Sequence, residues 1–469
     1  MGATFPFTEG LAVTFRVPAW VIRALPRSLA PATASGVPAT PGEVPASAEQ
    51  PRRTGQTFRA LRNRNYRLYY IGQMISLSGT WMQTIAQAWL VLQITDSKVA
   101  LGTVTMLQFL PITIFVLFAG VIADRVPKRN FLFVTQSVAM SQALALAVLV
   151  WTGHVQLWHV YILAMVLGLA NAFEQPTRQA LVVELVGRND VINAVALNAG
   201  MFNAARLVGP AIGGFVIAAA GVKSAFLLNA ISFLPVIVAL AMMRTSEMYA
   251  IDRAGPKGTG ALAELREGLA YAFNTPAAFL IVVLVAIIGT FGYNFTVMLP
   301  LIDRYVLDKG EIGLGFLTAA LGLGSVISAL LLAGREAATK RTLFVGSAVF
   351  TLLLGAVAAS QWYFVTLFLL MLMGVASTAF HATANTSMQL SSPDHLRGRV
   401  MALYMFLFAG STPIGGFLTG YMAEHLGVST AIGISAAMCG VGVVAGLLYY
   451  NAHRSEIPEV AGAPMGAPA

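Results

Sequence analysis

The chain alternates between long apolar stretches and short polar connections. Twelve stretches hold about 20 or more mostly apolar residues, the length that an α-helix needs to cross the hydrocarbon core of a bilayer. They are residues 67–93, 100–122, 131–151, 157–177, 194–219, 224–243, 277–300, 312–333, 342–360, 363–389, 400–423 and 428–450. These stretches are too long for the strands of a membrane barrel and lack their alternation. The pattern therefore predicts an all-α polytopic membrane protein with twelve transmembrane helices.

The longest polar connection between crossings divides them into two sets of six. It covers residues 244–276 and includes a predicted surface helix from Ala261 to Phe273. The expected organisation is an N-terminal half at 58–243, a linker at 244–276, a C-terminal half at 277–450, and tails at 1–57 and 451–469. The first tail is rich in Pro, Ala and Ser, and we expect it to be disordered and cytoplasmic.

The composition excludes several classes of protein. Hydrophobic residues make up 57% of the chain and charged residues only 10%, whereas soluble proteins carry roughly 25% charged residues. A soluble enzyme and a nucleic-acid-binding protein are therefore excluded. The lone Cys439 cannot form an intramolecular disulfide. The chain contains no HExxH pair, no G-x-S-x-G elbow and no phosphate-binding loop, so we expect no enzymatic activity, cofactor or metal.

Lysine and arginine fall mainly on one side of the expected membrane. If the amino end is cytoplasmic, all but five of the 29 basic residues lie on the cytoplasmic side. The exceptions are Lys98, Lys223, Arg304 and Lys309 on the opposite side, and Arg206 within a crossing. The positive-inside rule then predicts a protein of the inner (plasma) membrane with both termini cytoplasmic. This asymmetry also accounts for the net charge of +9 without a nucleic-acid partner.

The two halves share a short sequence. Residues 211–215 read AIGGF in the fifth crossing, and residues 413–417 read PIGGF in the eleventh. Their separation of about 200 residues matches six crossings, which indicates a duplication. Two such repeats with a central site between them are typical of secondary transporters.

The connection between the second and third crossings carries glycine and charge in a pattern typical of a gating loop. Its residues are Gly120, Asp124, Arg125, Lys128 and Arg129. The glycine allows close helix contact, and the charges can pair with a neighbouring helix end. This loop resembles the cytoplasmic signature of the major facilitator superfamily, with Pro127 in place of the usual glycine. The resemblance implies a latch between the halves; the alternative is a basic turn that only fixes topology.

The fifth crossing carries a second signature, Gly209, Pro210, Gly213 and Gly214. Proline kinks a helix, and the glycines allow tight packing at the kink. The pattern resembles the antiporter motif of the superfamily, although Ala205 replaces its first glycine. The alternative is a kink with no bearing on the direction of transport.

Four further segments resemble the enterobactin-exporter-like branch of the superfamily, the transmembrane secretion effector group. They are residues 78–83 (SGTWMQ), 88–90 (AWL), 108–111 (QFLP) and 176–180 (PTRQA). The resemblance implies the major facilitator fold and proton-driven export of siderophores, macrolides or other amphiphiles.

Ionisable residues inside crossings are rare and mark function by default. We expect Arg206 to face the bundle interior. Glu174 is a candidate proton carrier that pairs with Arg206 in one conformation, because burial favours the protonated form of a carboxyl. The alternative for Glu174 is a structural ion pair near the interface.

Polar and aromatic residues on the first, fourth, seventh and tenth crossings are candidates for the substrate cavity. They are Trp81, Gln83, Gln87, Asn171, Phe291, Tyr293, Asn294, His381 and Asn385. Many amides and aromatics with few charges favour a large amphiphilic substrate over a compact ion. The alternative is that these side chains join helices to one another.

The sequence therefore predicts a secondary-active exporter of small amphiphilic molecules that works by alternating access, with proton antiport. Its expected partners are a small-molecule substrate, protons and the lipid bilayer, and we expect a monomer. An uptake or facilitative transporter of the same fold remains an alternative, as does a non-transporting membrane receptor or scaffold.

Overall fold

The computed structural model describes residues 58–249, 261–332, 339–394 and 396–457. The tail at 1–57 and the residues from 458 onward lie outside these ranges. In the first part of the chain the long helices are α2 (Arg64–Thr95), α3 (Lys98–Arg125), α4 (Lys128–Trp151), α5 (Leu157–Val186), α6 (Val191–Ala220) and α7 (Val222–Ala241). We call α2–α7 the N-terminal group.

The second part of the chain repeats this arrangement. Its helices are α9 (Pro276–Gly292), α10 (Phe295–Ile302) with its continuation η4 (Asp303–Leu307), α11 (Gly310–Leu332), α12 (Lys340–Ala359), α13 (Tyr363–Ser391), α14 (Arg397–Leu426) and α15 (Val428–Ala452). We call α9–α15 the C-terminal group. Between the groups lies α8 (Ala261–Asn274), at the position of the expected surface helix. These helices confirm the all-α fold class.

Eleven helical stretches in the described residues are long and apolar enough to cross a membrane. The twelfth expected crossing corresponds to α2, which is 32 residues long and therefore about 48 Å in length at 1.5 Å per residue. Its hydropathy is lower because it carries buried polar side chains such as Gln73, Gln83 and Gln87. These amides face neighbouring helices, since α2 packs between α6 and α7. A helix that other helices largely cover needs only a small apolar surface toward lipid, which on α2 includes Ile71, Met74 and Ile75.

The seventh crossing is interrupted near its middle. Between α9 and α10, Tyr293 and Asn294 leave the helical conformation. The expected crossing at 277–300 ended at Pro300, but the helical path continues through η4 to Leu307. Interrupted helices of this kind occur in transporters where they line a site between repeats.

The link between the last two helices of each group is a single glycine. Gly221 joins α6 to α7 with φ of 77°, and Gly427 joins α14 to α15 with φ of 85°. A positive φ of this size favours glycine, because a side chain would clash with the backbone. Gly221 follows the AIGGF segment by six residues and Gly427 follows the PIGGF segment by ten, so the two segments lie in corresponding helices but not at the same distance from the link.

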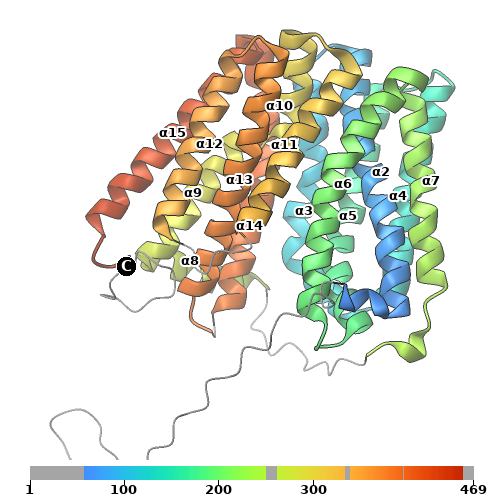
Figure 1. Ribbon diagram of the computed structural model, residues 1–469, viewed down its shortest axis with the longest axis horizontal. Coiled ribbons are helices and arrows are strands. Elements are labelled where there is room, and N and C mark those ends of the chain that lie inside the picture. The colour runs from blue at the N-terminus through green and yellow to red at the C-terminus, as the bar shows by residue number, and fades with distance from the viewer. Residues whose placement is uncertain (1–57, 250–260, 333–338, 395, 458–469) are drawn as a thin grey trace, which may run out of the picture. The chain divides into compact units, whose positions relative to one another are not determined.

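The two groups meet along two pairs of helices. In the described residues α3 packs against α14, and α6 packs against α11. Figure 1 shows the N-terminal group and the C-terminal group as two bundles of parallel and antiparallel helices. The helices that carry the expected motifs, α3 and α6, therefore lie at the contact between the groups.

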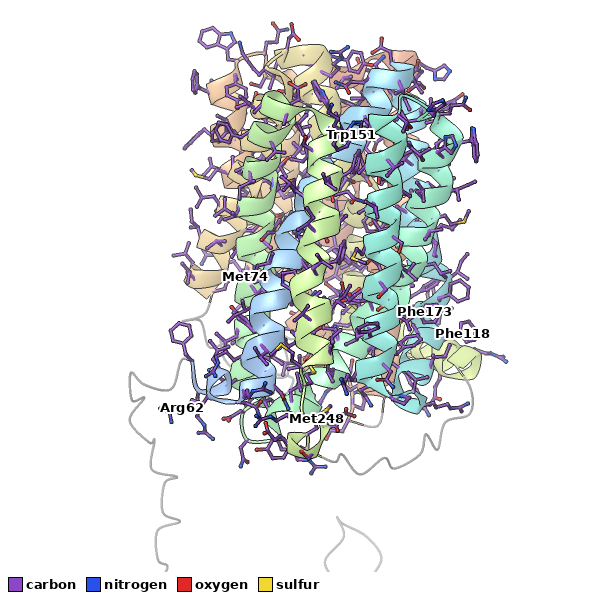
Figure 2. All side chains as sticks on the ribbon, turned by 90° about the vertical axis from the view of Figure 1, so that its right-hand side faces the viewer. Arg62, Met74, Phe118, Trp151, Phe173 and Met248 are labelled. Atoms are coloured by element: carbon purple, nitrogen blue, oxygen red, sulfur yellow. The ribbon has the colours of Figure 1, made fainter. Side chains whose placement is uncertain are left out.

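The bundle has two chemically distinct ends. One end carries Arg62, Arg64, Lys128 and Arg129, at the starts of α2 and α4, and we call it the basic end. Figure 2 shows Arg62 and Met248 at this end and Trp151 toward the opposite one, which we call the far end. The helix α8 also lies at the basic end, where Glu267 pairs with Arg399 of α14.

The apolar core joins the two groups at the far end. One large cluster contains C-terminal-group residues from both ends, together with residues from the far-end parts of the N-terminal group, such as Leu101, Leu146 and Phe226. Basic-end residues of the N-terminal group, such as Tyr69 and Leu185, form a separate cluster. Close van der Waals packing of apolar side chains therefore joins the groups away from the basic end.

Candidate functional site

A positive charge lies near the middle of the bundle on α6. The guanidinium carbon of Arg206 stands 5.8 Å from the centroid of the Trp81 ring on α2. Phe202, one turn earlier on α6, meets the same ring edge-on at 5.7 Å. A guanidinium over an indole face gains cation–π attraction, which is stronger away from water. The contact turns Arg206 toward α2 and away from the lipid, as the sequence predicts.

The C-terminal group presents an aromatic and hydrogen-bonded face at the same level. Tyr293, in the break of the seventh crossing, donates its hydroxyl hydrogen bond to the carbonyl of Ser377 at 2.6 Å. His381 Nδ1 lies 2.8 Å from the hydroxyl oxygen of Tyr404. The His381 ring also stacks on Phe408 with a centroid distance of 4.5 Å. These contacts fix the orientation of one titratable ring and two phenols.

These two faces lie close together. The charge of Arg206 interacts with both Tyr293 and His381 across the boundary between the groups. We call Trp81, Arg206, Tyr293, His381 and Tyr404 the central cluster. It draws on α2 and α6 from one group and on the α9–α10 break, α13 and α14 from the other. An arginine, a histidine and several rings can together hold an amphiphilic molecule that carries an acceptor or a negative charge.

Two residues of this face were not predicted from the sequence. Tyr404 and Phe408 lie one turn apart on α14, and both contact the His381 ring. Their spacing of four was visible in the eleventh crossing, but aromatic residues at helical spacing are common in apolar segments. Their common role becomes visible only when α13 is in place, because it brings His381 against both of them.

Other candidates for the cavity are engaged in contacts between helices. Gln83 donates to Gln142 Oε1 of α4 at 2.9 Å and accepts from Asn229 Nδ2 of α7 at 2.6 Å. Gln87 donates to Gln108 Oε1 of α3 at 3.0 Å. In this conformation both glutamines are buried and tie α2 to its neighbours, the alternative that the sequence left open.

The remaining cavity candidates are spread along the middle of the bundle. Asn294 is buried and donates to the carbonyl of Thr290 at 2.6 Å. Asn385 accepts from Gln389 on its own helix at 2.7 Å. Phe291 packs against the large apolar core, and Asn171 is half-buried on α5. Of the residues named in advance, Trp81, Arg206, Tyr293 and His381 come together, and Asn385 adjoins them through a contact with Tyr404.

Glu174 forms a polar group of its own within the N-terminal group. Its Oε1 lies 3.6 Å from Nε of Arg178 on the same helix, with both side chains less than one-fifth exposed. Gln136 of α4 donates to the same oxygen at 3.4 Å. The ion pairs of the described residues join Glu174 to Arg178 and not to Arg206. The carboxylate is therefore held loosely near the basic half of α5.

The charges of the expected gating loop contact the N-terminal group. Lys128 Nζ lies 2.8 Å from Glu184 Oε1 of α5, and both side chains are largely buried. Arg129 donates to the carbonyl oxygens of Leu240 and Ala241 at the end of α7. Cations near the carbonyl end of a helix are stabilising. The loop thus fixes α4 against α5 and α7.

Other parts of this loop are open. A methyl group placed on Gly120 would meet nothing within 4 Å, and Arg125 is exposed. The backbone of Asp124 belongs to the last turn of α3, while its side chain lies outside the described part of the structure. Packing in this conformation therefore gives no reason for glycine at position 120.

The glycines of the α6 kink motif face two different helices. A Cβ on Gly209 would stand 2.5 Å from the Ser78 carbonyl oxygen of α2, and one on Gly213 would stand 3.2 Å from Met82 Cγ. A Cβ on Gly214 would stand 2.6 Å from the Glu311 carbonyl oxygen of α11. Pro210 lies between them inside the helix. The motif therefore brings α6 against its own group on one side and against the other group on the opposite side.

Replacement of Gly213 by leucine should destabilise the packing of α6 on α2. Its side chain would have to displace Met82 backbone and side-chain atoms, and overpacking of this kind costs roughly 1–3 kcal/mol. We expect a lower thermal unfolding midpoint in detergent. Gly200→Leu is the matched control on the same helix, since nothing lies within 4 Å of that position. Equal midpoints for the two variants would contradict the close-contact argument.

Polar bridges join the groups at the far end. Glu424 Oε2 of α14 accepts from the backbone N–H of Lys98 at 2.6 Å and of Val99 at 3.4 Å, at the start of α3. Tyr305 of η4 donates to Asp96 Oδ1 at 2.8 Å. The Glu424 carboxylate thereby satisfies free N–H groups at a helix N-terminus, where negative charge is favoured. We call these contacts the far-end bridges.

Glycines bring the same helices close together. A Cβ on Gly102 of α3 would stand 2.7 Å from the Gly416 carbonyl oxygen of α14, and one on Gly420 would stand 2.5 Å from the Lys98 carbonyl oxygen. Thr113, near the middle of α3, donates to the Ala409 carbonyl at 3.2 Å. The contacts described between α3 and α14 thus run from the far end to mid-bundle.

The fold and the central cluster together define a class of protein. Two six-helix groups, joined at one end around polar and aromatic residues from both, form a membrane transporter of the major facilitator type. Among the described residues, no group of three His, Cys, Asp or Glu side chains is placed to hold a metal ion.

The chain belongs to the transmembrane secretion effector family, whose profile matches residues 55–465. This confirms the resemblance found in the sequence. The multidrug efflux pump Tap of Mycolicibacterium fortuitum is 28% identical over 380 residues, covering 78% of this chain and 91% of the relative. The staphyloferrin A transporter of Staphylococcus aureus is 25% identical over 366 residues, covering 77% and 90%. The family and these relatives are membrane transporters rather than enzymes.

Solved structures support the fold. A bacterial homologue of the human lysosomal transporter Spinster, in an inward-facing and unoccupied conformation, matches with a TM-score of 0.62 at 14% identity. The match covers 86% of this chain and 98% of that one. At this identity the likeness concerns the fold alone, which is that of a multi-pass membrane transporter.

Proposed function

We propose that the protein exports small amphiphilic molecules from the cell by alternating access, driven by proton antiport. The observation that carries the proposal is that the described contacts between the two groups lie from mid-bundle to the far end, with the central cluster at their inner limit. A site approached from one end is what alternating access requires. The efflux pump Tap among the relatives favours export of drug-like or siderophore-like molecules.

We assign the basic end to the cytoplasm. Positively charged residues gather on the cytoplasmic side of membrane proteins, and Arg64, Lys128, Arg129 and Arg399 lie at this end. Both termini are then cytoplasmic, in the plasma membrane, and the structure corresponds to an inward-facing conformation. A monomer is sufficient for this mechanism, since both groups of helices belong to one chain.

The gating loop acts as a latch in the opposite conformation. Here Lys128 and Arg129 are engaged within the N-terminal group, and Gly120 has open space beside it. When the basic ends close, the start of α14 approaches the end of α3, and glycine at position 120 allows that close contact. The charged loop then joins the two groups directly, which is a discrete two-state arrangement.

Glu174 is the proposed proton carrier of the N-terminal group. Its partners, Arg178 and Gln136, hold it at 3.6 Å and 3.4 Å, so a change in helix packing alters its environment readily. A carboxylate that loses its cationic neighbour in a dry site takes up a proton. In the outward-facing conformation Arg206 is the other cation available to it within the bundle.

Accumulation assays test this function. Efflux-deficient bacteria that express the protein should accumulate less of at least one compound from a panel of dyes, macrolides and catechol siderophores. Glu174→Gln or a protonophore should restore accumulation to the level of cells without the protein. Glu247→Gln is the control, because Glu247 is an exposed partner of Arg244 outside the membrane-spanning helices.

The direction of transport follows from the same assay. Higher accumulation with the intact protein would establish uptake and reject export. Unchanged accumulation of every compound, with the protein present in the membrane, would reject export of the proposed substrate class. Retention of proton-dependent export by Glu174→Gln would exclude Glu174 as the carrier.

A further inference from the structure

A buried carboxyl group lies at the far end, outside the sites considered so far. Asp303 is the first residue of η4, the π-helical continuation of the seventh crossing. Its exposed fraction is 0%, and among the described residues neither carboxyl oxygen has a partner at full hydrogen-bond geometry, although the backbone N–H of Gly310 lies nearby. A buried polar atom without a partner is rare in folded proteins and requires an explanation.

The elements packed against Asp303 supply little positive charge. Its charged neighbours are Asp308 and Lys309 on the connection to α11 and Glu311 at the start of α11, while α13 contributes the phenol of Tyr363. The first eleven residues of α15, 428–438, contain no titratable side chain. Of the charged neighbours two are acids, and the ion pairs in the described residues include none with Lys309.

The space around the carboxyl group is closed. A Cβ on Gly313 of α11 would stand only 2.7 Å from Asp303 Oδ1. On the side of α13, Tyr363 is close enough to be a candidate donor. Its hydroxyl donates to the Gly313 carbonyl at 3.1 Å and not to Asp303. The glycine therefore lets α11 cover the carboxyl group, and the donor that α11 brings near it is the backbone N–H of Gly310.

An ionised carboxylate is unfavourable in such a place. Burying an unpaired charge costs several kcal/mol, and the usual response is that the group becomes neutral. Neighbouring acids add repulsion, which disfavours the charged form further. A metal ion in place of the proton would need several oxygen ligands, and the described residues form no such cluster. Proton binding satisfies the charge without further ligands.

We propose that Asp303 is a proton-binding site that is occupied when the far end is closed and loses its proton when the far end opens. The inference rests on the proposed alternating access, because it assigns the proton to one of the two conformations. The proton is thus a ligand of the closed far end, separate from the carrier proposed at Glu174.

The residues next to Asp303 connect it to the boundary between the groups. Arg304 lies over the Trp89 ring of α2 at 5.8 Å, and Tyr305 bonds to Asp96 at the end of that helix. Lys98 of α3 lies 4.3 Å from the Tyr305 ring. Separation of the groups at the far end breaks these contacts and moves η4, which gives water access to the carboxyl group.

Linkage sets the direction of the effect. A ligand that binds one conformation better than the other shifts the population toward that conformation. If one proton binds the closed form and not the open one, the ratio of closed to open molecules changes up to tenfold per pH unit. Acid on the outside therefore closes the far end, and alkaline conditions favour its opening.

Spin-label distances between the groups test the proposal without any substrate. Labels replace the exposed residues Thr152 and Gln361, which lie at the far ends of α4 and α13, in a Cys439→Ala background of the full chain in lipid nanodiscs. We expect a short distance at acid pH and a growing population of longer distances as pH rises. Asp303→Asn, which is neutral at every pH, should keep the short distance throughout.

Asp308→Asn is the matched control. It removes the same charge five residues away at an exposed position with φ of 47°, a conformation that asparagine tolerates. This variant should keep the pH-dependent change in distance, with its transition moved to lower pH because Asp308 is one of the acids that repel the Asp303 carboxylate. Glu311→Gln serves as a second variant, because loss of its repulsion should move the transition to lower pH.

Two results would overturn the proposal: a far-end distance in the intact protein that does not change with pH, or an unchanged pH dependence in Asp303→Asn. Neither result concerns export, which the accumulation assay tests separately. Conversely, failure to find an exported compound would leave the distance measurements valid, so the two ideas fail independently.

Discussion

Replacement of Glu424 by alanine should open the far end of the protein. The variant loses the carboxylate that accepts from Lys98 and Val99 across the boundary between the groups. A hydrogen bond to a charged group contributes about 1.5–3 kcal/mol, and every 1.4 kcal/mol is a factor of ten in a population ratio. Because Glu424 is exposed to solvent, we expect the low end of this range, a shift of about tenfold. The label pair at positions 152 and 361 measures it directly.

His425→Ala is the control for this prediction. Its imidazole Nδ1 contacts the Tyr421 carbonyl of its own helix, so it changes the same helix end without breaking a contact between the groups. Its distance distribution should match that of the intact protein. If Glu424→Ala also matched the intact protein, the far-end bridges would not control closure.

Replacement of Lys128 by methionine should destabilise the N-terminal group. Lys128 and Glu184 are 6% and 12% exposed, and their charged atoms lie 2.8 Å apart. Removal of one partner of a buried ion pair costs about 3–5 kcal/mol, because the other charge loses its main compensation. The variant should unfold at a markedly lower denaturant concentration in mixed micelles. We expect about 3 kcal/mol, since the pair lies near the membrane surface.

The charge-free double variant separates the ion pair from packing. Lys128→Met combined with Glu184→Gln removes both charges and should recover part of the lost stability. The exposed pair Arg244 and Glu247 provides a comparison, where Arg244→Met should change the free energy of unfolding by less than about 1 kcal/mol. Equal losses at the two sites would contradict the role assigned to Lys128.

The fold could be predicted from the sequence because a chain segment inside lipid must satisfy its own backbone hydrogen bonds. Long apolar stretches must be helices, and glycine, proline and basic residues mark their ends and orientation. The prediction was wrong at the end of the seventh crossing, where polar residues from Asp303 onward were placed outside the membrane-spanning helix. Their helical path depends on covering by α11, which hydropathy alone does not indicate.

The candidate site was predictable only in part. Arg206 was identified because ionisable residues are rare in apolar crossings, and Trp81, Tyr293 and His381 because they are polar or aromatic residues of the first, seventh and tenth crossings. The structure brings these four together. Gln83 carries the same signal, yet it bonds to Gln142 and Asn229. Whether an amide faces a cavity or another helix depends on the rotation of its helix. That rotation is set by contacts between residues far apart in the sequence, here 59 and 146 positions.

The roles of individual charges were the least predictable feature. Glu424 follows the eleventh crossing as an ordinary polar residue, but it caps a helix from the other half of the chain. Asp303 belongs to a run of charged residues that looks like a solvated loop, and it is fully buried. Tertiary structure brings the start of α3 to Glu424. It also buries Asp303 away from side-chain partners among the described contacts.

Alternating access is tested most directly by measuring both ends of the bundle in the same protein. A second label pair at Ser246 and Gly398, both exposed at the basic end of their groups, complements the pair at positions 152 and 361. As pH rises, the far-end distance should lengthen while the basic-end distance shortens in the same fraction of molecules. Distances that stay fixed at both ends, under every pH and with every compound of the panel, would contradict a transporter mechanism and favour a rigid membrane scaffold.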